Sequence, residues 1–62
     1  MPIIEVKLYD RRVDADSAAR IIHEMTEALV RACQDESVRD ITNVIVEGVA
    51  PANWGVAGKP GS

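Results

Sequence analysis

A proline behind the initiator methionine and a pair of adjacent arginines are the residues of this chain best suited to chemistry. The chain begins MPIIEVKLYDRR, so Pro2 follows Met1, and Arg11 and Arg12 close the same stretch. Methionine aminopeptidases generally remove Met1 before a small residue, so we expect Pro2 to become the N-terminus. Its nitrogen would then be a secondary amine, which in its neutral form near pH 7 is a general base and can also attack carbonyls.

The protonation of that amine decides whether Pro2 can act as a base. An α-amino group ordinarily has a pKa of about 7.7–8.0, and a proline amine has a higher one. Apolar surroundings and nearby cations lower an amine's pKa, and Arg12, with Arg11 beside it, could supply the cations. The alternative is structural: Pro2 only begins an edge strand, where the missing N–H does no harm. The Met-Pro pair alone favours this structural interpretation.

The length of the chain indicates one domain, residues 1–62, that needs help to become stable. A domain of this size buries only about 60% of the surface that its unfolded chain exposes. Cys33 is the only cysteine, which excludes a disulfide within the chain. Cys33 and His23 do not have metal-ligand spacing, so we do not expect a metal to stabilise the chain. Oligomerisation is the remaining way to stabilise so small a domain, and a hydrophobic content of 47% is consistent with it.

The charge and the hydropathy pattern exclude several kinds of partner. The net charge is −3 and only seven Lys and Arg residues are present, which argues against nucleic acid as a partner. No apolar run approaches the ~18 residues of a membrane helix. The N-terminus contains Glu5 and lacks the apolar core of a signal peptide. We therefore expect a cytoplasmic protein that binds neither nucleic acid nor membrane.

Three elements can be predicted from apolar periodicity. Residues 3–9 alternate with a period of two, which predicts a strand. Residues 15–34 have apolar side chains at helical spacing, and either Asp14 or Asp16 can cap that helix. Residues 41–49 predict a second strand that is apolar on both faces, after a polar connection. The tail, residues 50–62, is rich in Pro and Gly and predicts a short hairpin or an arm around Trp54.

The order strand, long helix, strand predicts an α+β protomer. A crossover of this length joins parallel strands. One helix covers only one face of a two-stranded sheet, so the other apolar face must be covered by further copies of the chain. We therefore predict an obligate homo-oligomer.

The segments PIIEVKLYDRR and VIVEGVAPANWGVAGKP, with a helix between them, resemble the 4-oxalocrotonate tautomerase family over nearly the whole chain. The resemblance implies a β-α-β subunit, a homohexamer, and sites that lie between subunits. It implies that Pro2 is the catalytic base and that Arg12 binds a substrate carboxylate and polarises the adjacent oxygen. It also implies that Trp54 belongs to the apolar wall of the site. Arg11 occupies a slot often filled by glycine, where it either adds to the positive field or faces solvent.

One departure from the family pattern affects substrate binding. A second arginine of the family falls, in this sequence, on Thr42. Arg39 lies three residues earlier and is a weaker candidate for the same role. If Arg39 does not reach the site, a monocarboxylate or another substrate becomes more plausible than a dicarboxylate. His23 is expected to face solvent, and Cys33 to be a small buried hydrophobe.

These considerations predict a cofactor-independent tautomerase that acts on a small unsaturated 2-oxo acid or 2-hydroxydienoic acid. Pro2 would move the proton, Arg12 would hold the carboxylate, and Trp54 would line the pocket. One alternative is hydration or dehalogenation of an unsaturated acid with Pro2 acting as an acid. Another is a non-catalytic, ligand-binding oligomer. The sequence does not identify the physiological substrate.

Overall fold

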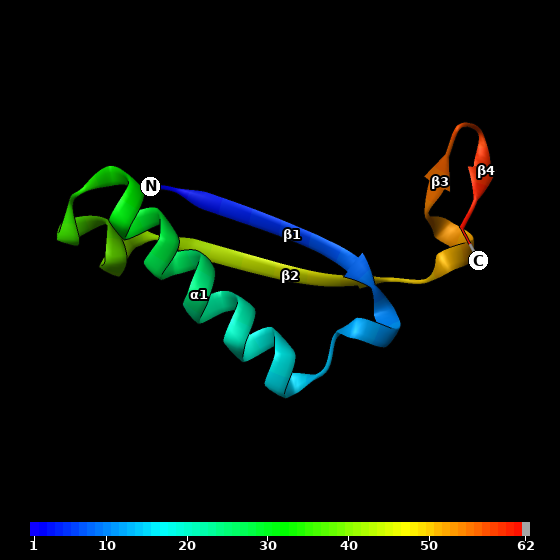
Figure 1. Ribbon diagram of the computed structural model, residues 1–62, viewed down its shortest axis with the longest axis horizontal. Helices are drawn as coiled ribbons and strands as arrows, with labels where there is room; N and C mark the ends of the chain where they lie inside the picture. Colours follow the sequence, from blue (N-terminus) through cyan, green and yellow to red (C-terminus); the bar gives the residue numbers. More distant parts are fainter. Residues whose placement is uncertain (62) are drawn as a thin grey trace.

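A computed structural model of the chain describes residues 1–61 and consists of a β-α-β unit followed by a small hairpin (Figure 1). In chain order the elements are β1 (Ile3–Tyr9), the 3-10 turn η1 (Asp10–Arg12), α1 (Ala15–Cys33), the 3-10 helix η2 (Glu36–Ile41), β2 (Asn43–Val49), the 3-10 turn η3 (Pro51–Asn53), β3 (Gly55–Val56) and β4 (Lys59–Pro60). The predicted α+β protomer is confirmed. None of the helices within residues 1–61 has the length and apolar character needed to cross a lipid bilayer.

The main sheet consists of β1 and β2, which pair in parallel from Ile3 opposite Asn43 to Tyr9 opposite Val49. The second strand begins at Asn43, two residues later than predicted, because Ile41 belongs to η2. Two side chains favour the 3-10 conformation there. Asp35 accepts a hydrogen bond from the Ser37 backbone N–H at 2.9 Å, and the Thr42 hydroxyl donates to the Val38 carbonyl at 2.6 Å.

The start of α1 is fixed by a reciprocal pair of hydrogen bonds. The Asp14 carboxylate accepts from the Ser17 N–H at 2.8 Å, and the Asp14 N–H donates to the Ser17 hydroxyl at 2.9 Å. This capping box makes Asp14, and not Asp16, the N-cap residue. Hydrogen bonds to the charged form lower the pKa of the Asp14 carboxyl, so the cap is fully formed at neutral pH. The helix ends at Cys33, and Gln34 terminates it with a left-handed backbone, φ 54°.

The core of the single chain is thin. Helix α1 lies along one face of the sheet (Figure 1), and Val30, which is 4% exposed, is the one hydrophobic residue within 1–61 that is buried. Two other large apolar residues of α1, Ile22 and Met25, remain about two-fifths exposed. The predicted burial of Cys33 is wrong for the single chain, because its side chain is exposed at the last turn of α1.

The face of the sheet that points away from α1 leaves large apolar side chains exposed. Ile3 is 61% exposed and Ile45 is 51% exposed, and both lie on this open face together with an ion pair between Lys7 and Glu47 at 2.7 Å. Exposed aliphatic side chains on a sheet face mark an interaction surface. We propose that further copies of the chain cover this face.

We expect the protein to sediment as an oligomer at micromolar concentration, and Ile45→Asp to weaken that assembly. A charge at position 45 would have to be buried without a partner when another copy covers the open face. Analytical ultracentrifugation measures the mass directly. His23→Asp, on the exposed side of α1, is the matched control and should not change the assembly. A folded, stable monomer of 6.7 kDa for the wild-type chain would contradict the prediction.

The C-terminal hairpin projects beyond the β-α-β unit (Figure 1). Its strands β3 and β4 are antiparallel, with Val56 opposite Lys59. Between them Ala57 and Gly58 both have positive φ, 54° and 80°, as a type I′ turn requires. This confirms the hairpin predicted around Trp54, except that residue 62 of the predicted tail lies outside the described residues.

Candidate active site

Pro2 is held at the start of the sheet through its carbonyl group. The Asn43 N–H donates a hydrogen bond of 2.9 Å to the Pro2 carbonyl, which extends the pairing of β1 and β2 by one residue. The side chain of Pro2 is half-buried, whereas Met1 is 86% exposed. The bond that holds Pro2 does not involve its nitrogen. Removal of Met1 would therefore free the amine and leave the position of the residue unchanged.

Arg12 lies at the other end of β1, as the last residue of η1. Its carbonyl accepts a hydrogen bond from the Ser17 hydroxyl at 3.0 Å, so the cap of α1 also fixes the backbone of Arg12. The side chain is exposed, and within residues 1–61 its guanidinium forms no ion pair. Arg12 is thus an anchored residue with a free cationic group, which suits the binding of a carboxylate.

One chain cannot bring Pro2 and Arg12 together. The seven residues of β1 separate them, and a strand of that length spans roughly 20 Å at about 3.3 Å per residue. Within one chain, Arg12 is therefore too far away to polarise a substrate that is in contact with Pro2, or to lower the pKa of its amine.

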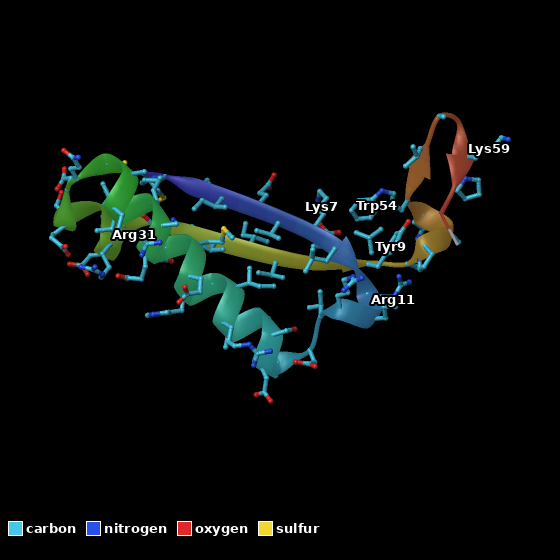
Figure 2. The ribbon with its side chains drawn as sticks, viewed as in Figure 1. Lys7, Tyr9, Arg11, Arg31, Trp54 and Lys59 are labelled. Carbon is cyan, nitrogen blue, oxygen red and sulfur yellow. The ribbon has the colours of Figure 1, made fainter. Side chains whose placement is uncertain are left out.

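Trp54 lies at the Arg12 end of the sheet, in a cluster with Tyr9 and Arg11 (Figure 2). The Tyr9 and Trp54 rings pack edge to face, with centroids 5.0 Å apart and an interplanar angle of 66°. The Arg11 guanidinium carbon lies 5.0 Å from the centroid of the Tyr9 ring, within the range of a cation–π interaction. We call Tyr9, Arg11 and Trp54 the aromatic cluster. It joins the end of β1 to the base of the hairpin.

Close backbone packing completes this junction. The Gly61 N–H donates to the Trp54 carbonyl at 2.6 Å, and a Cβ atom at position 61 would collide with the Tyr9 hydroxyl. A side chain at position 61 would therefore displace the Tyr9 ring from its present place. The sequence did not single out Tyr9 for a role. Its place at the last position of β1 was predictable, but its contact with Trp54 depends on how the tail folds back.

Arg39 is placed away from the aromatic cluster and already has partners. Its guanidinium donates two parallel hydrogen bonds to the Glu27 carboxylate, at 2.8 and 2.9 Å, and also pairs with Glu36. These hydrogen bonds raise the pKa of Arg39 further above its usual value and lower that of Glu27. To bind a substrate carboxylate, Arg39 would have to exchange one of these partners for it. Its arrangement is that of a residue that ties η2 to α1.

The remaining candidates contribute little to a site. His23 is exposed, as expected, and its side chain lies 3.8 Å from the Glu24 carboxylate. Within residues 1–61 the single chain encloses no pocket, and no three His, Cys, Asp or Glu side chains come together in a group that could hold a metal. The fold and these placements define a small β-α-β protein with a proline at one end of β1 and free arginines at the other.

The comparisons with known proteins agree with this class. The family model described as tautomerase enzyme matches residues 2–61. A protein named as a probable tautomerase from Ralstonia nicotianae is 37% identical over 62 residues, which cover all of this chain and 84% of that protein. No solved structure matches the chain. The chain belongs to the tautomerase family.

Proposed function

We propose that this protein is a cofactor-independent tautomerase that moves a proton between oxygen and carbon of a small unsaturated 2-oxo acid. Membership of the tautomerase family is the observation that carries the proposal. The placement of Pro2 adds to it, because the residue is held only through its carbonyl and has a nitrogen that removal of Met1 would free. A cytoplasmic location also remains part of this proposal.

In the proposed reaction Pro2 carries the proton and Arg12 stabilises the charge. The neutral amine of Pro2 takes the proton from the enol oxygen, and the resulting dienolate holds the negative charge. The Arg12 guanidinium binds the carboxylate and stabilises the developing oxyanion. The protonated amine then returns the proton to carbon, which regenerates the base and leaves the 2-oxo product.

If Pro2 and Arg12 act on the same substrate molecule, their separation along β1 requires two chains in each site. We propose that Pro2 of one chain meets Arg12 of another across an oligomer, a hexamer if it follows the family resemblance. Trp54, which lies near Arg12 on the same chain, would contribute the apolar wall. Such a wall excludes water and favours the neutral form of the amine.

Mixing two inactive variants tests the two-chain site. A chain with one extra residue before Pro2 lacks the amine, and Arg12→Ala lacks the guanidinium, so each is expected to be nearly inactive alone. When the two are unfolded, mixed and refolded, some sites receive an intact Pro2 from one chain and an intact Arg12 from another. We expect the mixture to regain ketonisation activity with phenylenolpyruvate, followed by ultraviolet absorbance.

Each variant refolded by itself is the control for this mixing experiment. A mixture as inactive as its parents, although native mass spectrometry shows mixed oligomers, would mean that both residues must come from one chain. If the wild-type protein with a mass showing free Pro2 has no activity toward any 2-oxo acid enol, the proposed function is wrong.

A further inference from the structure

Two free arginines, and not one, lie at the end of β1. Arg11 and Arg12 are consecutive, both are exposed, and within the described residues 1–61 neither forms an ion pair. The adjacent carboxylate, that of Asp10, is paired with neither of them. A solvent-exposed pair of like charges without a counter-ion is a site of positive potential that an anion can relieve.

Arg11 is restrained in a way that a merely solvated arginine is not. Its guanidinium lies 5.0 Å from the centroid of the Tyr9 ring, and Tyr9 is itself packed against Trp54 (Figure 2). This cation–π contact restricts the positions that the Arg11 guanidinium can take. Arg11 is therefore linked through Tyr9 to Trp54, the residue proposed to line the site.

Arg39, the other candidate for binding a second carboxylate, is by contrast already paired with carboxylates of its own chain. Arg39 is bound by Glu27 and Glu36 and would have to break charge-assisted hydrogen bonds to take a ligand. Arg11 has no such bond to break. Of the two candidates, Arg11 is the one with its donors available.

We propose that Arg11 is the second anion-binding residue of this protein and gives it a preference for dicarboxylates. The inference rests on the proposed function and extends it. Arg12 would bind the carboxylate next to the reacting carbon, and Arg11 the distal carboxylate of the same small unsaturated diacid. Consecutive residues of a 3-10 turn have Cα atoms about 3.8 Å apart and point roughly 120° away from each other. Two guanidinium groups that point in different directions are better placed to bind two separated carboxylates than to bind a single carboxylate together.

A matched pair of substrates tests this role. The diacid is 2-hydroxyhexa-2,4-dienedioate, and the monoacid 2-hydroxypenta-2,4-dienoate lacks its distal carboxylate. We expect Arg11→Gln to lower the ratio of kcat/KM for diacid over monoacid by about tenfold, or about 1.4 kcal/mol, chiefly through the KM for the diacid. A ratio equal to that of the wild type would overturn the proposal.

Two further variants separate charge from structure. Arg20→Gln removes an exposed cation of α1 outside the site and should leave the ratio unchanged. Arg11→Lys keeps the charge but loses the planar fork, so we expect it to restore part of the preference. Circular dichroism shows whether Arg11→Gln folds. If it does not, Arg11→Lys takes its place, and a ratio of kcat/KM for diacid over monoacid equal to that of the wild type would then count against a contact specific to the guanidinium.

Ionic strength gives an independent readout. Exposed charges are screened by salt, with a Debye length of about 8 Å at 0.15 M. The diacid preference of the wild type should fall as salt is raised, and that of Arg11→Gln should fall less, because only Arg12 remains to attract the extra charge of the diacid. If the wild type turns over neither acid, the proposed function fails, and calorimetric titration with hexanedioate then decides on Arg11 alone. Equal affinity of wild type and Arg11→Gln for hexanedioate would overturn the inference.

Discussion

A chain with one extra residue in front of Pro2 is expected to fold and assemble like the wild type and to lose nearly all of its proton-transfer activity. The added peptide bond converts the amine of Pro2 into an amide, which has no basicity. Folding should be unaffected, because the structure holds Pro2 through its carbonyl and the residue before it is 86% exposed. A positioned general base typically contributes about 10²–10⁴-fold to a rate, so we expect a loss in that range.

The measurement is the rate of phenylenolpyruvate ketonisation by processed and extended protein, each of mass confirmed by mass spectrometry. Sedimentation of both preparations shows whether assembly is equal. Equal rates in the two preparations would rule out Pro2 as the base and would favour a non-catalytic protein.

The pH dependence gives a second readout of the same residue. If Pro2 is the base, activity should rise with pH through one ionisation, because only the neutral amine accepts a proton. Arg12 of another chain and the apolar wall both disfavour the protonated amine, so the pKa should lie below that of a free proline amine. Pro2→Ala leaves a primary amine in the same place. It should keep part of the activity with a shifted pH profile.

Replacement of Arg12 by alanine is expected to have the second large effect. The guanidinium is proposed to stabilise the negative charge of the dienolate, and loss of one such donor typically costs about 10²–10³-fold in kcat, or about 2.7–4 kcal/mol. The fold should survive, because α1 is capped by Asp14 and Ser17, and Ser17 contacts only the backbone carbonyl of Arg12.

Two other variants serve as controls for Arg12→Ala. His23→Ala removes an exposed side chain outside the site and should leave kcat/KM unchanged. Arg39→Ala breaks the pairs with Glu27 and Glu36, so we expect it to lower the melting temperature and to reduce activity less than Arg12→Ala does. An activity loss equal to that of Arg12→Ala in a stably folded Arg39→Ala would show that Arg39 reaches the substrate. Full activity of Arg12→Ala would refute the proposed site.

Most of the protomer follows from local patterns in the sequence. The alternation in residues 3–9 predicts β1 to the residue, and the apolar spacing of residues 15–34 predicts α1 to within one residue at its end. Parallel pairing follows from the length of the crossover between the strands. These features are predictable because backbone periodicity and connection length are local properties of a chain. The start of β2 lies two residues later than the apolar pattern predicts, because the side chains of Asp35 and Thr42 form hydrogen bonds that favour a 3-10 conformation in the connection.

The residue types and their spacing identify the reactive groups: a proline that can become a free amine, two adjacent arginines, and a tryptophan in a tail predicted to form a hairpin or an arm. The positions of these groups relative to one another depend on the tertiary fold. An extended β1 separates Pro2 from Arg12, and the folded-back tail brings Trp54 onto Tyr9 and Arg11. The packing of η2 against α1 also pairs Arg39 with Glu27, which lies 12 positions away in the sequence. The physical reason is that residue type and spacing set what each group can do, whereas contacts between distant segments depend on how whole elements pack.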